Sequence, residues 1–156
     1  MLEITIPGHR VLLLQYLVMD YNGTLALDGV LLDGVRPRLI SLSERLQLHV
    51  VTADTFGLAR SQLTGLPCEL AILPVEEQAN AKLTYIQRLG EDHVVAIGNG
   101  RNDHRMLQAA ALGIAIIQGE GSALETCLAA DVLTPDILAA LDLLLFPKRL
   151  IATLRS

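Results

Sequence analysis

Two features of the 156-residue sequence predict an α/β fold, a Rossmann-type parallel sheet with helices on both faces. Short apolar runs of strand length alternate with stretches in which apolar residues recur at helical spacing. Two of these runs end abruptly in polar clusters, as interior strands do at the carboxyl edge where open α/β sheets bind ligands. Strands that alternate with helices of this length indicate βαβ units with right-handed crossovers.

The composition predicts a single domain spanning residues 1–156, because this length buries a sizeable core without disulfides or structural metal. A formal charge of −5 argues against an electrostatic nucleic-acid binder, and 3% aromatic residues leave no base-stacking platform. Cys68 and Cys127 lack metal-ligand spacing and are expected to be small buried residues. The N-terminal residues resemble neither a signal peptide nor a membrane span, so we expect a cytoplasmic protein without a membrane partner.

The first half of the chain should contain a β-hairpin that leads into the first polar cluster. Leu2 to Pro7 alternates apolar and polar residues, and a turn at Gly8-His9 would pair this strand with Val11 to Met19. The elements expected next are an Asp-Gly-punctuated excursion over 26–34, a helix carrying Val35, Leu39, Leu42 and Leu46, a strand over 48–51, a helix closing near Gly65, a strand over 69–73 and a helix over 76–89.

The second half continues the alternation of strands and helices. The expected elements are a strand over 93–97, a helix carrying Met106, Leu107, Ala110 and Ala111, a strand over 113–117, a helix with a Ser122/Glu125 capping box, a strand over 130–133 and a last helix starting at Thr134-Pro135.

The first polar cluster is Tyr16 to Leu25, an apolar strand that ends in Asp20. Gly23 permits the sharp turn that leaves the strand, and Thr24 with exposed backbone N–H groups can donate hydrogen bonds to an anion beside Asp20. A solvated strand-end aspartate followed by an ordinary Asn-Gly turn is the alternative for these residues taken alone.

The second cluster follows the strand that ends at Ile97 and contains Asn99 and Asp103. Neighbouring carboxyl edges would bring these side chains to Asp20, where two carboxylates and further acceptor oxygens make a Mg²⁺ site. From a third strand end, Thr52 can bind a phosphoryl oxygen, and Lys82 can neutralise its charge. The alternatives are that Thr52 only caps a helix, Lys82 is a solvated charge and Asp103 only favours a helix N-terminus.

These four segments, in this order, resemble the motifs of the haloacid dehalogenase superfamily, and within it the soluble proteins similar to the phosphorylation domain of P-type ATPases. Asp20-Tyr-Asn-Gly-Thr24 resembles the first motif, Thr52 the second, Lys82 the third and Gly98-Asn-Gly-Arg-Asn-Asp103 the fourth. The resemblance covers about Val11 to Ala130 and rests on motif order as much as on any single motif.

The resemblance implies a Mg²⁺-dependent phosphatase that acts through an aspartyl-phosphate on Asp20. The residues it implies are Asp20, Asn22 and Lys82 in catalysis; Gly23, Thr24, Thr52, Ala53 and Lys82 in phosphate binding; and Asp20, Asn22, Asn99 and Asp103 around the metal, with Asn22 binding through its main-chain carbonyl. Nothing in the motifs requires Arg101 or His104, for which a surface role is expected, although Arg101 could meet an anionic substrate. The role of Asp54 stays open.

Two positions depart from the superfamily's phosphatase pattern, because amides stand at Asn22 and Asn99 where carboxylates are usual. The missing acid at Asn22 predicts slow turnover, since general acid–base catalysis is typically worth about 10²–10⁴ in rate. The missing charge at Asn99 should weaken Mg²⁺ binding. A non-catalytic phosphate-binding or regulatory module and a structural oligomer are therefore alternative functions.

No segment between Thr24 and Lys82 is long enough for a cap domain or a separate nucleotide-binding domain, so an open site is expected. A lid would then come from a large substrate or from a neighbouring subunit. The apolar stretch from Leu143 to Ile151 favours a homo-oligomer in which one subunit partly covers the Asp20 pocket of another. Docking of this stretch onto its own sheet is the equal alternative.

Overall fold

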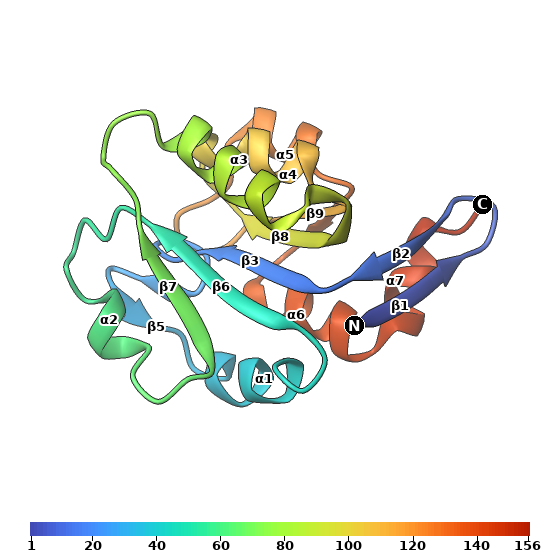
Figure 1. The fold of residues 1–156 in the computed structure, drawn as a ribbon, viewed down its shortest axis with the longest axis horizontal. Helices are drawn as coiled ribbons and strands as arrows, with labels where there is room; N and C mark the ends of the chain where they lie inside the picture. The colour runs from blue at the N-terminus through green and yellow to red at the C-terminus, as the bar shows by residue number, and fades with distance from the viewer.

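In the computed structural model, which describes residues 1–156, six parallel strands form one central sheet (Figure 1). Its strand order is β10-β9-β8-β3-β6-β7, which places the strand ending in Asp20 at an interior position. The strands are β3 Tyr16–Asp20, β6 Gln47–Thr52, β7 Cys68–Ile72, β8 Val94–Gly98, β9 Leu112–Ile116 and β10 Val132–Thr134. The predicted fold class is confirmed.

Helices cover both faces of this sheet, and each face has its own apolar core (Figure 1). Along β3, Met19 faces the larger core and Val18 the smaller one, as the two-residue period of a strand requires. One face carries α3 Gln78–Leu89, α4 His104–Ala109 and α5 Leu124–Ala129, and the other carries α1 Val35–Leu42, α2 Ala59–Gln62 and α6 Ile137–Leu145.

The N-terminal hairpin was predicted, and it consists of β1 Leu2–Ile6 paired antiparallel with β2 Arg10–Leu14. The predicted single strand from Val11 to Met19 is wrong, because the chain leaves the hairpin at Gln15 and enters the central sheet as β3. There the backbone of Gln15 bonds to His93 and Gln47, one residue from each neighbouring segment. The hairpin therefore extends beyond the amino end of the sheet (Figure 1).

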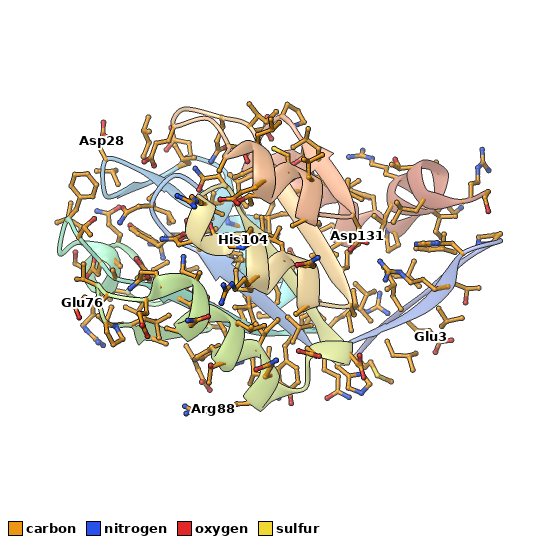
Figure 2. All side chains as sticks on the ribbon, turned by 90° about the horizontal axis from the view of Figure 1, so that it is seen from above. Glu3, Asp28, Glu76, Arg88, His104 and Asp131 are labelled. Atoms are coloured by element: carbon orange, nitrogen blue, oxygen red, sulfur yellow. The ribbon has the colours of Figure 1, made fainter.

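The C-terminal apolar stretch docks onto its own chain, which is the second of the two alternatives. After α6, helix α7 Pro147–Leu154 packs against β1. Leu144 and Leu150 are buried in the larger core, while Phe146 remains 53% exposed. Figure 2 shows Glu3 on the hairpin and Asp28 near the carboxyl edge at opposite ends of the molecule. The hairpin and α7 thus lie far from the Asp20 edge.

Only a short two-stranded flap separates β3 from α1, formed by β4 Ala26–Leu27 and β5 Val30–Leu31. Two 3₁₀ turns, η1 Glu91–His93 and η2 Arg101–Asp103, flank β8. None of the helices combines the length and apolar character needed to cross a bilayer.

Several local predictions are wrong where polar side chains found other partners. The Ser122/Glu125 capping box is absent, because the Ser122 hydroxyl donates to the Asn99 carbonyl and α5 begins after Ala123. The helix predicted to start at Thr134-Pro135 begins after Asp136, whose carboxylate accepts the Ala139 N–H. It was predicted to be the last helix, but α7 follows it. Both cysteines are half-buried and free, not fully buried.

Candidate active site

Three adjacent strand ends build the polar edge. Asp20 is the last residue of β3; its register partner in β6 is Val51, next to Thr52, and β8 on the other side leads into Asn99. A pocket of about 210 Å³ opens at this edge. It is lined by Asp20, Asn22, Thr52, Ala53, Asp54, Thr55, Gln78, Lys82, Asn99, Gly100, Asn102 and Glu120.

Lys82 joins the two carboxylates of this edge. Its Nζ lies 2.8 Å from Asp20 Oδ1 and 2.7 Å from Asp103 Oδ1. Lys82 is 1% exposed, Asp103 fully buried and Asp20 8% exposed, so this is a buried ionic cluster. Lys82 and Ile86 are the buried residues of α3. The solvated-charge alternative for Lys82 is wrong.

Burial and mutual charge set the ionisation of this cluster. Burial, followed by the nearby Asp103 charge, raises the pKa of Asp20 to about 6, although Lys82 opposes the shift. Burial also lowers the pKa of Lys82, but the Asp20 and Asp103 carboxylates outweigh it and hold that pKa above its usual value. Two ionised carboxylates beside one ammonium leave a net negative charge in a buried place, which favours a cation there.

Backbone groups hold Asp103 in position. Its Oδ2 accepts the N–H groups of Asn99 and Gly100 at 3.1 and 2.9 Å. The approach requires glycine at position 98, because a Cβ there would lie 2.5 Å from Asp103 Cγ. Asp103 is therefore fixed by the turn that follows β8 and does more than favour a helix N-terminus.

The loop after β3 supplies a hydroxyl and an amide. Thr24 Oγ1 lies 3.2 Å from Asp20 Oδ2 and 3.2 Å from Asn99 Oδ1, so its single proton can serve either oxygen. Gly23 has a φ of 81°, and a Cβ there would lie 2.7 Å from Asn99 Nδ2. The predicted sharp turn at Gly23 is thus present and tightly surrounded.

Asn22 contributes a buried acceptor without a donor. Its Oδ1 has no hydrogen-bond partner, although the residue lines the Asp20 pocket. A buried unpaired oxygen costs about 1–3 kcal/mol, so it favours a ligand that can satisfy it. Asn22 is drawn toward the flap by an isolated backbone bridge to Ala26.

The end of β6 forms the opposite wall. Thr52 Oγ1 accepts the Asp54 N–H at 2.9 Å, which leaves its own proton free to donate. Asp54 Oδ1 in turn accepts the Ala59 N–H at 3.0 Å at the start of α2. Asp54 thus bonds to the start of α2, and it lines the pocket together with Thr52 and Ala53.

Arg101 and His104 lie outside the Asp20 pocket. They line an adjoining groove of about 560 Å³ that shares Gln78, Gly100 and Asn102 with it. Arg101 pairs with Glu125 on the surface, and Figure 2 shows His104 at the start of α4. Both residues therefore lie at the surface, as the sequence predicted, and neither reaches the Asp20 pocket.

Sequence reasoning missed Gln118 and Glu120, which reach the site from the loop after β9. Glu120 lines the Asp20 pocket, and Gln118 bonds to the backbone of Gly23 and Thr24. The only signal in the sequence was the pair of glycines, Gly119 and Gly121, that flank Glu120 after an apolar strand.

Comparisons with known proteins agree with this geometry. Residues 78–135 match the family model described as haloacid dehalogenase-like hydrolase. Two Methanocaldococcus jannaschii proteins are 44% identical to parts of this chain. Uncharacterized protein MJ0073 matches over 80 residues, 49% of this chain and 86% of its own length, and uncharacterized protein MJ0072 over 42 residues, 27% and 96%.

The fold is also similar to that of solved phosphatases. The 3-deoxy-D-manno-octulosonate 8-phosphate phosphatase from Moraxella catarrhalis, solved with magnesium, phosphate and KDO, superimposes with a TM-score of 0.68 at 18% identity, over 91% of this chain and 94% of its own. The cobalt-bound enzyme from Haemophilus influenzae gives 0.67 at 15% identity, over 92% and 94%. Because the family model matches the segment from α3 to β10, the chain belongs to the haloacid dehalogenase-like hydrolases.

Proposed function

We infer that this protein is a Mg²⁺-dependent phosphatase that transfers a phosphoryl group to Asp20 and then to water. The observation that carries the proposal is the buried Lys82 ammonium bridging Asp20 and Asp103 at the end of the central strand. A buried ion pair contributes little net stability, because desolvation offsets much of the Coulombic gain. Its presence in an accessible pocket is therefore better explained by chemistry.

The residues fit a hard divalent cation. Mg²⁺ prefers oxygen ligands, and this edge offers the carboxylates of Asp20 and Asp103 with the amide oxygen of Asn99. The net negative charge of the cluster and the unpartnered Asn22 Oδ1 favour the same ion. The main-chain carbonyl of Asn22 completes the proposed set of metal ligands. When bound, the metal would draw charge from the phosphoryl oxygens.

Asp20 is the proposed nucleophile because it is the ionisable group at the open end of the cluster. One of its carboxylate oxygens bonds to phosphorus while the bond from phosphorus to the leaving oxygen breaks. The Lys82 ammonium and the Thr52 hydroxyl stabilise the negative charge that spreads over the phosphoryl oxygens, with the Ala53 backbone N–H completing the cradle. The predicted use of the Gly23 and Thr24 backbone N–H groups is wrong, because they donate to the Ala26 and Tyr21 carbonyls. Water then attacks the phosphoryl group and releases Asp20.

Turnover is expected to be slow unless a residue other than Asn22 supplies the acid and base. Asn22 stands in the pocket where the superfamily's phosphatases carry an acid, and an amide neither gives nor takes a proton at this step. The substrate is a phosphorylated compound, and the sugar phosphatases of similar fold do not identify it.

A ligand and turnover experiment tests the proposal. Mg²⁺ with beryllofluoride should raise the melting temperature, because a ligand bound only by the folded state stabilises it. The protein should also release phosphate from p-nitrophenyl phosphate, and Asp20→Asn should abolish this release. A temperature rise without any release would identify a phosphate-binding or regulatory module. Neither response would leave the structural-oligomer alternative.

A homo-oligomer is still proposed as the source of a lid, on different grounds from the apolar C-terminal stretch. The flap is short, and the hairpin with α7 lies at the other end of the molecule, so the chain's own C-terminus does not supply a cover. Light scattering at micromolar concentration should give more than the monomer mass. A monomer mass would leave a macromolecular substrate as the source of cover.

A further inference from the structure

The loop after β9 is fastened to the site from both of its ends. Gln118 Nε2 donates to the carbonyl oxygens of Gly23 and Thr24 at 3.0 and 2.7 Å, and its Oε1 accepts the Ile137 N–H. On the other side, Asn99 Nδ2 donates to the Gly121 carbonyl at 3.0 Å. A tight turn, with the Gly121 N–H bonded to the Gln118 carbonyl, joins the two anchors.

This turn places Glu120 against the loop that follows the proposed nucleophile, Asp20. Glu120 Oε2 would collide with a Cβ on residue 23, so it occupies space that exists because residue 23 is glycine. The side chain lines the same pocket as Asp20 and Asn22. Its carboxylate takes part in no hydrogen bond or ion pair within the chain, and the residue is exposed to solvent.

The other carboxyl groups near this pocket are already engaged. Asp20 and Asp103 share Lys82, and Asp103 also accepts two backbone N–H groups. Asp54 Oδ1 accepts the Ala59 N–H on the opposite wall. Glu120 is therefore the unengaged carboxyl group of the pocket in which Asn22 lacks a proton to give.

We propose that Glu120 is the general acid and base of this enzyme and does the work that Asn22 cannot do. This inference rests on the proposed phosphatase function. In the first step Asp20 bonds to phosphorus, the leaving oxygen departs, and the Glu120 carboxyl group gives it a proton. In the second step the Glu120 carboxylate takes a proton from the water that attacks phosphorus, the bond to Asp20 breaks, and phosphate leaves.

Glu120→Gln tests this with p-nitrophenyl phosphate, whose good leaving group needs no acid in the first step. The variant should release a burst of one equivalent of nitrophenolate and then turn over roughly 10²–10⁴-fold more slowly than the wild type, with phosphoenzyme accumulating. Glu125→Gln is the matched control, because that exposed glutamate on α5 lies outside the pocket and should keep wild-type rates. Adding Asn22→Asp to Glu120→Gln should restore much of the lost rate and remove the burst.

Three results would overturn the assignment: an unchanged steady-state rate in Glu120→Gln, a slow rate without accumulated phosphoenzyme, or a defect that disappears at saturating Mg²⁺. The same burst in Asp54→Asn but not in Glu120→Gln would move the role to Asp54 and also reject it. Failure of the phosphatase proposal itself is distinguishable, because the wild type would then release no phosphate. Melting temperatures of all variants control for folding.

Discussion

The two ends of the central sheet shift the pKa of a buried basic side chain in opposite directions. At the carboxyl end, Lys82 keeps its charge because two carboxylates face it, and its pKa is raised despite burial. Toward the amino end, His49 on β6 is 3% exposed, and burial lowers its pKa. The nearest carboxylate, on Glu69, is 3.6 Å away but its side chain is 76% exposed, so it compensates little.

The difference separates the proposed active site from the part of the molecule that stabilises the fold. The amino end is closed by the hairpin and α7, whose leucines and isoleucines enter the larger core. Burial of apolar surface stabilises such a region directly. The carboxyl end carries buried charges and an unpaired amide oxygen, which stabilise the fold little by themselves. Changes at the two ends should therefore have different consequences.

The largest effect is expected for Lys82→Met, which removes the ammonium and leaves two carboxylates facing each other. Breaking a buried ion pair from one side typically costs about 3–5 kcal/mol, and the loss of charge stabilisation should also abolish phosphatase turnover. Urea unfolding without metal and a phosphate-release assay measure the two losses. A variant that is both stable and active would contradict the account of the carboxyl end.

Leu150→Ala tests the amino end in the same way. Leu150 on α7 is fully buried in the larger core, and truncating a buried leucine costs roughly 2–5 kcal/mol. Turnover at a temperature where the variant is folded should match the wild type, because the site lies at the other end of the sheet. A drop in turnover with little loss of stability would show that the two ends are coupled.

The smallest effect should come from His49 at acidic pH. Its folded-state pKa is lowered, so the unfolded chain takes up the proton first as pH falls below the ordinary value of about 6.5. Its contribution to stability is present above that value and is lost as pH falls through the folded-state pKa, by at most about 1.4 kcal/mol per pH unit. His49→Gln should flatten this part of the pH profile of urea unfolding. Identical profiles would mean that His49 does not titrate differently on folding.

The sequence predicted the carboxyl end better than the amino end. Asp20, Thr52 and Asp103 follow apolar strands, and the parallel topology brings their strand ends together whatever the details of the loops. Lys82 was expected near them as a counter-charge to a phosphoryl group, but no local pattern showed that its side chain would be buried between Asp20 and Asp103. The hairpin was visible as an alternating pattern, but the break at Gln15 was not, since it depends on backbone bonds to His93 and Gln47.

Contacts between distant loops could not be predicted from local patterns. Gln118 and Glu120 reach the site through a turn about 95 residues after Gly23, and only tertiary structure fixes that approach. Ser122 was predicted to cap a helix, but its hydroxyl donates to the carbonyl of Asn99, which is distant in the sequence. The packing of the apolar stretch from Leu143 to Ile151 also depends on a distant segment, because α7 packs against β1. The sequence alone therefore left two alternatives for this stretch.

The central claim is that Asp20 carries the phosphoryl group, and mass spectrometry of the acid-quenched enzyme tests it most directly. During turnover of p-nitrophenyl phosphate, the peptide that contains Asp20 should gain the mass of one phosphoryl group, sensitive to hydroxylamine as an acyl phosphate is. The signal should persist in Glu120→Gln, where hydrolysis is slowed, and be absent in Asp20→Asn with the fold intact. Phosphate release by the Asp20→Asn variant at the wild-type rate, or a phosphoryl group on another residue, would contradict the account.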